Sequence, residues 1–171
     1  LLQLVAENLP NSPTDASISG NELAVAAGNN VYVYTWDGSA FALSQTLAQS
    51  EAVFSVATNG SRLVAGALAR GALFVFVKAN GAYAADHTIA QVGAGYVTYG
   101  ITMTSSRLVV NYQATDLYVY KLDELAGSPT LGQYVMDVET YGAGIIDVTS
   151  GLTNFRQVRY AAVLDGATLV A

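Results

Sequence analysis

Cysteine is absent from this chain of 171 residues, and histidine occurs once, at His87. Without cysteine the protein has no disulfide framework, no thiol nucleophile and no thiolate ligand for a metal. The seven Lys and Arg residues stand singly along the chain, whereas a protein that follows nucleic-acid phosphates needs a basic stripe. No apolar run approaches the ~18 residues of a membrane-spanning helix. We therefore expect neither nucleic-acid binding nor membrane insertion.

Charged residues are also scarce. They make up 12% of the chain, against 52% for hydrophobic residues, while soluble domains usually contain about 25% charged residues. Uncharged surface of that extent is usually covered by a partner, by an assembly or by glycan. A compact stack of sheets that buries both faces of each sheet would also explain the composition, and the sequence leaves both explanations open.

The chain contains an internal repeat. Three similar aromatic segments carry it: Val31–Tyr34, Leu73–Phe76 and Leu117–Tyr120. Their first aromatic residues, Tyr32, Phe74 and Tyr118, lie 42 and 44 residues apart. A turn and an apolar segment precede each one, and a polar-apolar segment follows. A period of this length with four short strands is typical of β-propeller blades. The three aromatic residues are predicted to be buried between blades, because such strands are covered on both faces.

A fourth copy of the repeat is shorter by one strand. Ile145–Gly151 matches Val53–Asn59, and Asp165-Gly166 predicts a tight turn between two later strands. The N-terminal segment has the pattern of the missing outer strand, because four residues at equivalent positions follow one another at 42, 42 and 46 residues: Gln3, Gln45, His87 and Gln133.

We therefore predict one all-β domain over residues 1–171, a four-bladed β-propeller of four-stranded blades. The predicted blades span about 14–47, 52–91, 96–138 and 143–171 plus 1–7. The N-terminal strand completes the fourth blade, either in cis or in trans with a neighbouring chain, since strand addition to an open edge is a known recognition mode. The residues of this assembly strand and of its expected partner strand are Leu2, Leu4, Val5, Leu169 and Val170.

The repeat resembles the FG-GAP repeat of integrin α-chains and of many bacterial surface proteins, and Ser55–Phe76 is the segment most similar to it. The resemblance implies a propeller whose loops at one end of the axis bind a ligand. Three features differ from the family. The Phe-Gly pair is degraded, and the loops at Asp37 and Asp165 each offer one carboxylate where a calcium loop needs several oxygen ligands. Integrin-like propellers also have seven blades. We expect neither calcium nor any other metal or cofactor.

Few residues suggest catalysis. His87 follows Asp86, but neighbouring side chains on a strand face opposite sides, so we predict a solvated histidine that forms no acid–base pair with this aspartate. Asp137 and Glu139 share one strand face and could form a carboxylate pair, although solvated edge charges are the expected alternative. We identify no catalytic residue from the sequence.

Two further sets of residues are candidates for surface contacts. Tyr96, Tyr99 and Tyr141 lie near loops and are predicted to contribute to an exposed partner face. Asn59-Gly60-Ser61 is an N-glycosylation sequence, and a hairpin turn at this repeat position explains the same residues without a sugar.

Two functions remain open. The first is a non-enzymatic structural subunit of an extracellular or cell-surface assembly, above all a filament, which associates with further copies of itself through strand and apolar contacts. The alternative is an FG-GAP-like propeller module that binds a protein or carbohydrate ligand through loops at one end of the axis. Size-exclusion behaviour or electron microscopy would distinguish the two.

Overall fold

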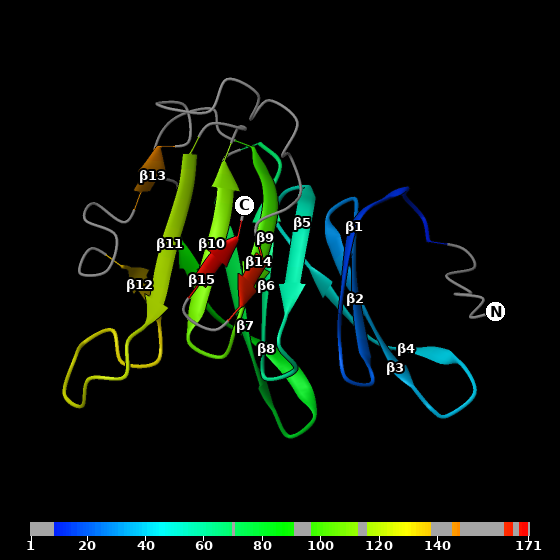
Figure 1. Cartoon of the computed structure of the whole chain (residues 1–171). Helices are drawn as coiled ribbons and strands as arrows, with labels where there is room; N and C mark the ends of the chain where they lie inside the picture. Colours follow the sequence, from blue (N-terminus) through cyan, green and yellow to red (C-terminus); the bar gives the residue numbers. More distant parts are fainter. Residues whose placement is uncertain are drawn as a thin grey trace.

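The computed structural model describes residues 9–69, 71–90, 97–112, 116–137, 145–147, 163–165 and 168–170. Fifteen β-strands lie in these ranges. Twelve of them form three four-stranded antiparallel sheets in which consecutive strands are neighbours. Figure 1 shows the three sheets side by side, with β5 between β1 and β9. The fold is therefore all-β.

The first sheet consists of β1 (Pro13–Ser19), β2 (Glu22–Ala27), β3 (Asn30–Trp36) and β4 (Phe41–Ala48). The second consists of β5 (Val53–Thr58), β6 (Arg62–Ala67), β7 (Leu73–Ala79) and β8 (Ala82–Ile89). The third consists of β9 (Thr98–Met103), β10 (Arg107–Tyr112), β11 (Asp116–Leu122) and β12 (Tyr134–Met136).

A tight turn joins β2 to β3. Ala27 pairs with Asn30, which leaves a two-residue turn, and Gly28 in that turn has a φ of 59°. Glycine adopts positive φ without the steric penalty that a Cβ brings.

Both faces of the middle sheet are buried. Leu63 and Phe76 point toward the first sheet and pack with Val33, whereas Val64 and Val75 point toward the third sheet. Successive side chains on a strand face opposite sides, so a continuous apolar run is what a strand covered on both faces requires. Three aromatic residues are predicted to be buried between blades. Tyr118 is buried between the second and third sheets, and Phe74 is half-buried between the first and second. Tyr32 is buried too, but on the side of the first sheet that faces away from the second.

The first strand of each sheet contains a β-bulge at the same repeat position. The pairing of β1, β5 and β9 with the next strand shifts by one residue. At the shift, the register passes over one residue of each strand: Thr14, Phe54 and Tyr99. Bulges redirect side chains and bend the strand, and here they aim these residues along the line where the sheets meet.

One predicted alignment is wrong. Val33 pairs with Gln45 and Val75 with His87, but the equivalent Val119 accepts a hydrogen bond from the Asp137 backbone at 2.9 Å. Tyr134 pairs with Leu122 as Tyr83 pairs with Lys78. Asp137, three residues after Tyr134, therefore occupies the position of Asp86, and Gln133 is not the counterpart of Gln45 and His87. The physical reason is the long β11–β12 connection, in which Gln133 belongs to a turn. The Gln133 amide donates a hydrogen bond of 2.8 Å to the Thr130 carbonyl.

Three short strands follow. β13 (Ile145–Asp147) pairs with β11 of the third sheet, and β14 (Val163–Asp165) pairs with β15 (Thr168–Val170). In this hairpin Leu169 lies opposite Leu164 and Val170 opposite Val163. The predicted assembly-strand residues Leu2, Leu4 and Val5 lie outside the described residues.

Candidate interaction surfaces

A charged residue opens the second strand of each of the three sheets. Glu22, Arg62 and Arg107 pair with Thr35, Val77 and Lys121 at equivalent registers. The next residue on each strand is a leucine. Leu63 faces the first sheet, Leu108 faces the second sheet, and Leu23 lies on the side of the first sheet away from the second. Because neighbouring side chains on a strand alternate, each charged side chain lies on the opposite face of its sheet from this leucine. Sequence reasoning did not identify this position, although the repeated pattern of a turn, a charge and a leucine was visible.

Glu22 is buried between the first and second sheets with 5% of its surface exposed. Its carboxylate accepts hydrogen bonds from the Tyr83 hydroxyl and from the Lys78 ammonium. Thr58 Oγ1 lies 2.9 Å from the Tyr83 oxygen. Burial, followed by the hydrogen bond to Glu22, raises the pKa of Tyr83, which keeps the phenol neutral as a donor. A buried carboxylate needs such partners, because an unpaired buried charge is strongly unfavourable.

Side chains also bond to backbone across this interface. Gln45 Nε2 donates to the Tyr83 carbonyl at 2.7 Å, and the Tyr83 amide donates to Gln45 Oε1 at 2.8 Å. Asp15 Oδ2 accepts from the Val56 amide at 2.9 Å, and Ser17 Oγ accepts from the Thr58 amide at 3.1 Å. Burial raises the pKa of Asp15, and its backbone hydrogen bonds oppose that change. These contacts satisfy strand backbone that the sheets themselves leave unpaired.

The second and third sheets meet through aromatic rings. The Arg62 guanidinium lies 5.9 Å from the centre of the Tyr134 ring, within cation–π range, and Tyr112 packs edge-on against Tyr118 at 5.0 Å. Among the described residues the hydroxyls of Tyr112, Tyr120 and Tyr134 are buried without a hydrogen-bond partner. Burial raises the pKa of Tyr120 and that of Tyr134 to about 12.

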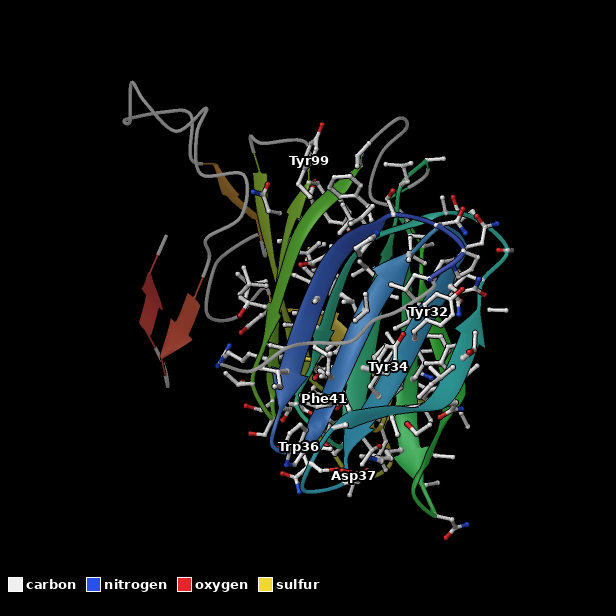
Figure 2. All side chains as sticks on the ribbon, turned by 90° about the vertical axis from the view of Figure 1, so that its right-hand side faces the viewer. Tyr32, Tyr34, Trp36, Asp37, Phe41 and Tyr99 are labelled. Atoms are coloured by element: carbon white, nitrogen blue, oxygen red, sulfur yellow. The ribbon has the colours of Figure 1, made fainter. Side chains whose placement is uncertain are left out.

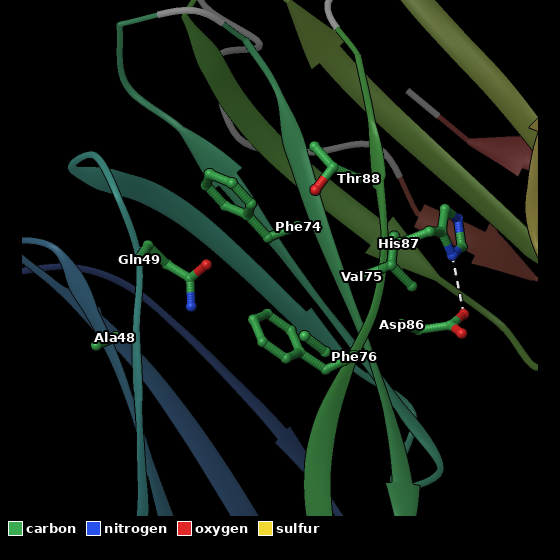
Figure 3. A pocket seen from close by; sticks show the side chains of 9 residues that line it. Ala48, Gln49, Phe74, Val75, Phe76, Asp86, His87 and Thr88 are labelled. Atoms are coloured by element: carbon green, nitrogen blue, oxygen red, sulfur yellow. Dashed lines mark hydrogen bonds and ion pairs between the residues drawn. The ribbon is translucent and has the colours of Figure 1, made fainter.

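The prediction that His87 and Asp86 do not form a hydrogen-bonded pair is wrong. His87 Nδ1 lies 2.8 Å from Asp86 Oδ2, as Figure 3 shows. The pairing of β7 with β8 moves from His87 directly to Ala85, so Asp86 stands in a bulge where side chains no longer alternate. Arg62 Nη1 lies 3.8 Å from the same carboxylate oxygen. The pair thus lies beside Arg62, whose guanidinium also approaches the Tyr134 ring of the third sheet.

A pocket of about 190 Å³ lies between β4 and the outer strands of the second sheet, with Phe74, Phe76, Gln49 and Thr88 among its lining residues. In Figure 3 the two phenylalanine rings face Gln49, and the His87 imidazole lies on the other side of β8. The pocket is thus mainly a gap in the packing of two aromatic rings, and the imidazole does not point into it.

The interpretation of Asp137 as a solvated edge charge is also wrong. Asp137 is fully buried, at 0% exposure, and it forms an ion pair with Arg107. Both residues belong to the face of the third sheet that points away from the second, which we call the far face. Glu139 lies outside the described residues.

The first sheet presents an apolar face on the side away from the second sheet, which we call the outer face (Figure 2). Tyr32, Tyr34 and Leu23 are buried there with Phe41 packed against them, and Trp36 lies 5.2 Å from the Phe41 ring. Two further residues of this face are exposed. Ile18 pairs with Leu23 and is 62% exposed, and Leu43 pairs with Tyr34 and is 55% exposed.

The residues predicted for surface contacts have structural partners. Tyr99 packs edge-on against Phe54 at 5.7 Å between the centres of the rings. Asn59 Oδ1 accepts from the Ser61 and Arg62 amides, and its Nδ2 donates to the Thr104 carbonyl at 2.9 Å. A sugar attached to Asn59 Nδ2 would have to leave room for the hydrogen bond to Thr104 or replace it. Glycosylation of Asn59 therefore stays a prediction. Tyr96 and Tyr141 lie outside the described residues.

The acidic turns bond to their own chain. Asp37 Oδ1 accepts from Ser39 and Ala40, and these hydrogen bonds lower the pKa of Asp37. Within the described ranges no three His, Asp or Glu residues gather as a metal site. In the same ranges no helix has the length and apolarity needed to cross a membrane.

Comparisons with known proteins support the fold alone. No family model matches the chain, and no curated protein matches it either. Among solved structures it is similar to that of Saccharomyces cerevisiae Sqt1, a WD40 β-propeller protein, with a TM-score of 0.58 and 14% identity. The match covers 74% of this chain and 34% of that chain, so the chain spans about a third of the Sqt1 length. The three sheets are thus arranged as in a β-propeller.

Proposed function

We propose that this chain is a non-enzymatic structural subunit that associates with further copies of itself in an extracellular or cell-surface assembly, most simply a filament. The observation that carries the proposal is the outer face of the first sheet. Ile18 and Leu43 are exposed there, beside a partly buried aromatic pair, Trp36 and Phe41.

The position of this face in the stack supports the proposal. The corresponding face of the second sheet is covered by the first sheet, and that of the third sheet is covered by the second. The centre of the outer face is buried as well, but Ile18 and Leu43 remain exposed, and exposed apolar surface is typical of interaction sites. The low content of charged residues, 12% of the chain, has the same implication.

We further propose that the chain contains four FG-GAP-like blades, with residues 1–7 as the outer strand of the fourth. The repeat pattern supports this arrangement, and so does the β14–β15 hairpin around the predicted Asp165-Gly166 turn. Deleting residues 1–7 tests it. Pairing in cis predicts a destabilised monomer, and pairing in trans predicts a folded monomer that no longer assembles. Unchanged stability and assembly would contradict both forms of the arrangement.

Light scattering coupled to size exclusion, with negative-stain electron microscopy, tests the structural role. We expect a molar mass that rises with protein concentration and ordered polymers at the highest concentrations. Association through an apolar face should persist at high salt, because screening weakens only charge-driven contacts. A chain that remains monomeric at every concentration and salt level would contradict the proposal.

A ligand-binding module is the second candidate, and the Phe54–Tyr99 pair favours it. Both rings are partly exposed, and aromatic residues are enriched where proteins bind partners. Under this alternative, replacing Tyr99 with Ala removes binding to an oligosaccharide or peptide library and leaves the mass distribution unchanged. A library with no binder would leave the structural role as the better explanation.

A further inference from the structure

Two Asn-Gly pairs lie in turns of the second sheet, and their surroundings differ. Asn59-Gly60 lies between β5 and β6, and Asn80-Gly81 lies between β7 and β8. We infer that Asn80 is a site of spontaneous deamidation, that Asn59 is protected by its contacts, and that the product at Asn80 weakens the contact between the first and second sheets. This reaction would occur whether or not the chain assembles, so it goes beyond the proposed function.

Deamidation of an Asn-Gly pair needs no enzyme. The backbone nitrogen of the glycine gives up its proton and forms a bond to Cγ of the asparagine, and the bond from Cγ to Nδ2 breaks with release of ammonia. Water then adds to one of the two carbonyl carbons of the resulting succinimide ring, which gives aspartate or isoaspartate. Glycine favours ring closure because it has no Cβ to obstruct it. The reaction therefore requires an accessible glycine nitrogen and an asparagine side chain that can rotate.

The turn at Asn80 meets both requirements. Ala79 pairs with Ala82, which leaves a two-residue turn in which Asn80 and Gly81 have φ angles of 52° and 83°. All four residues are exposed, at the end of the second sheet (Figure 1). Neither the Asn80 side chain nor the Gly81 amide forms a hydrogen bond with a described residue. Exposed turns of this kind open at low free-energy cost, so the Gly81 nitrogen can reach Cγ.

The space around the two glycines differs in the same sense. A Cβ added to Gly81 would meet no atom within 4 Å, whereas a Cβ on Gly60 would lie 3.3 Å from Ser19 Oγ of the first sheet. The nitrogen of Gly81 is therefore open to solvent and to base, and that of Gly60 lies where two sheets meet.

The turn at Asn59 meets neither requirement. Asn59 Oδ1 accepts a hydrogen bond from the Arg62 amide at 2.8 Å, and Nδ2 donates to the Thr104 carbonyl at 2.9 Å. The Gly60 amide donates to Thr58 Oγ1 at 3.1 Å. Both reacting groups are thus engaged, and ring closure would first have to break these hydrogen bonds.

The reaction at Asn80 would affect the first interface, because two residues of that interface flank the turn. Lys78 and Tyr83 pair with each other across the hairpin, and both donate hydrogen bonds to Glu22. Isoaspartate lengthens the main chain within the turn, and the length of a hairpin turn sets the register of its strands. The product should therefore move Lys78 and Tyr83 relative to Glu22 and weaken the contact between the two sheets.

Peptide mapping by mass spectrometry tests the location of the reaction. The chain, purified from a host that adds no glycan, is incubated at mildly alkaline pH, either folded or unfolded in urea, and conversion of both asparagines is followed with time. In the folded chain we expect Asn59 to react at least about tenfold more slowly than Asn80, because its hydrogen bonds add to the barrier. In urea, where these bonds are absent, the two rates should be similar. Equal rates in the folded chain, a faster reaction at Asn59, or no reaction at Asn80 would overturn the inference.

Asn80→Gly is the matched control for the effect on the interface. Gly-Gly also fits a turn with two positive φ angles, and it has no side-chain amide to lose. After the same incubation we expect the unaltered chain to melt about 2–4 °C lower than before, with faster amide hydrogen exchange at Tyr83, and Asn80→Gly to change in neither respect. An equal loss in both proteins, or an unchanged melting temperature in a chain converted at Asn80, would overturn the link between this turn and the first interface.

Discussion

The interface between the first and second sheets and the interface between the second and third use the same backbone positions with different chemistry. The first relies on polar contacts: a buried glutamate, a lysine, a tyrosine hydroxyl and the double hydrogen bond of Gln45. The second relies on rings, with Arg62 over Tyr134 and a group of tyrosines whose hydroxyls are buried. Both interfaces exclude water from an apolar centre.

The difference shows that the repeat specifies geometry more strictly than it specifies residue chemistry. Glu22 and Arg62 carry opposite charges at equivalent positions, and each finds an aromatic residue of the next sheet. A buried carboxylate can use the phenol as a donor, and a guanidinium can use the electron-rich ring face. The same backbone position therefore accepts either charge, provided that a tyrosine faces it.

The largest expected effect is at Glu22. Replacing it with Ala removes the acceptor for Tyr83 and Lys78 and leaves both donors in a poorly hydrated interface. We expect a loss of about 3 kcal/mol in the free energy of unfolding. Urea denaturation measures it, with Glu124→Ala as the exposed control. A loss no larger than that of the control would show that the polar contacts of the first interface contribute little.

A smaller effect is expected at Gln45. Its side chain makes two hydrogen bonds with the Tyr83 backbone, at 2.7 and 2.8 Å, and each is worth about 1 kcal/mol. Replacement with Ala should therefore destabilise the protein by about 2 kcal/mol and speed amide hydrogen exchange at Tyr83. Gln49→Ala is the matched control, since Gln49 makes one longer bond of 3.2 Å, to Leu47. Unchanged exchange at Tyr83 would contradict the assignment.

The burial of a phenol in the second interface can be tested by its alkaline sensitivity. The pKa of Tyr120 is raised from 10.0 to about 12 by burial, so the folded state holds this proton more tightly than the unfolded state. The contribution of this proton to the free energy of unfolding is complete below pH 10. It is lost as the pH rises to about 12, by on the order of 1 kcal/mol per pH unit.

Tyr120→Phe removes this ionisation. It should cost no more than about 1 kcal/mol at neutral pH, because the hydroxyl interacts only with that of Tyr112 among the described residues, and it should flatten the alkaline decline of stability. Thermal unfolding at several pH values measures both effects. Parallel pH profiles for the variant and the unaltered chain would count against the burial of this phenol.

The smallest effect is expected at Asp123, outside both interfaces. Its carboxylate accepts hydrogen bonds from Ser128, Thr130 and the Leu125 amide, which lower its pKa below the ordinary value of 3.8. The stabilisation is present above that value and disappears as the pH falls through the lowered pKa. Asp123→Asn should lower the melting temperature slightly at pH 7 and have no effect at the acid end. A constant difference at all pH values would exclude this cause.

Much of the fold could be predicted from the sequence, because the strands repeat at a nearly constant period and alternate between two apolar faces. The three sheets and the burial of Tyr32 and Tyr118 follow from that pattern. The relation between His87 and Asp86 could not be predicted in the same way. Strict alternation separates them, and the bulge that brings them together depends on how β8 pairs with β7.

The sequence by itself determined the period, the all-β class and the scarcity of charge, since these depend on local propensity and on composition. The tertiary structure decided which charges are buried and what they contact. Glu22, Arg62 and Asp137 are separated in sequence from the groups that they contact. The packing of the first sheet on the second brings Lys78 to Glu22, and the pairing of strands within one sheet brings Asp86 to Arg62 and Arg107 to Asp137. A charge becomes a structural contact when packing removes its water and supplies a partner in its place.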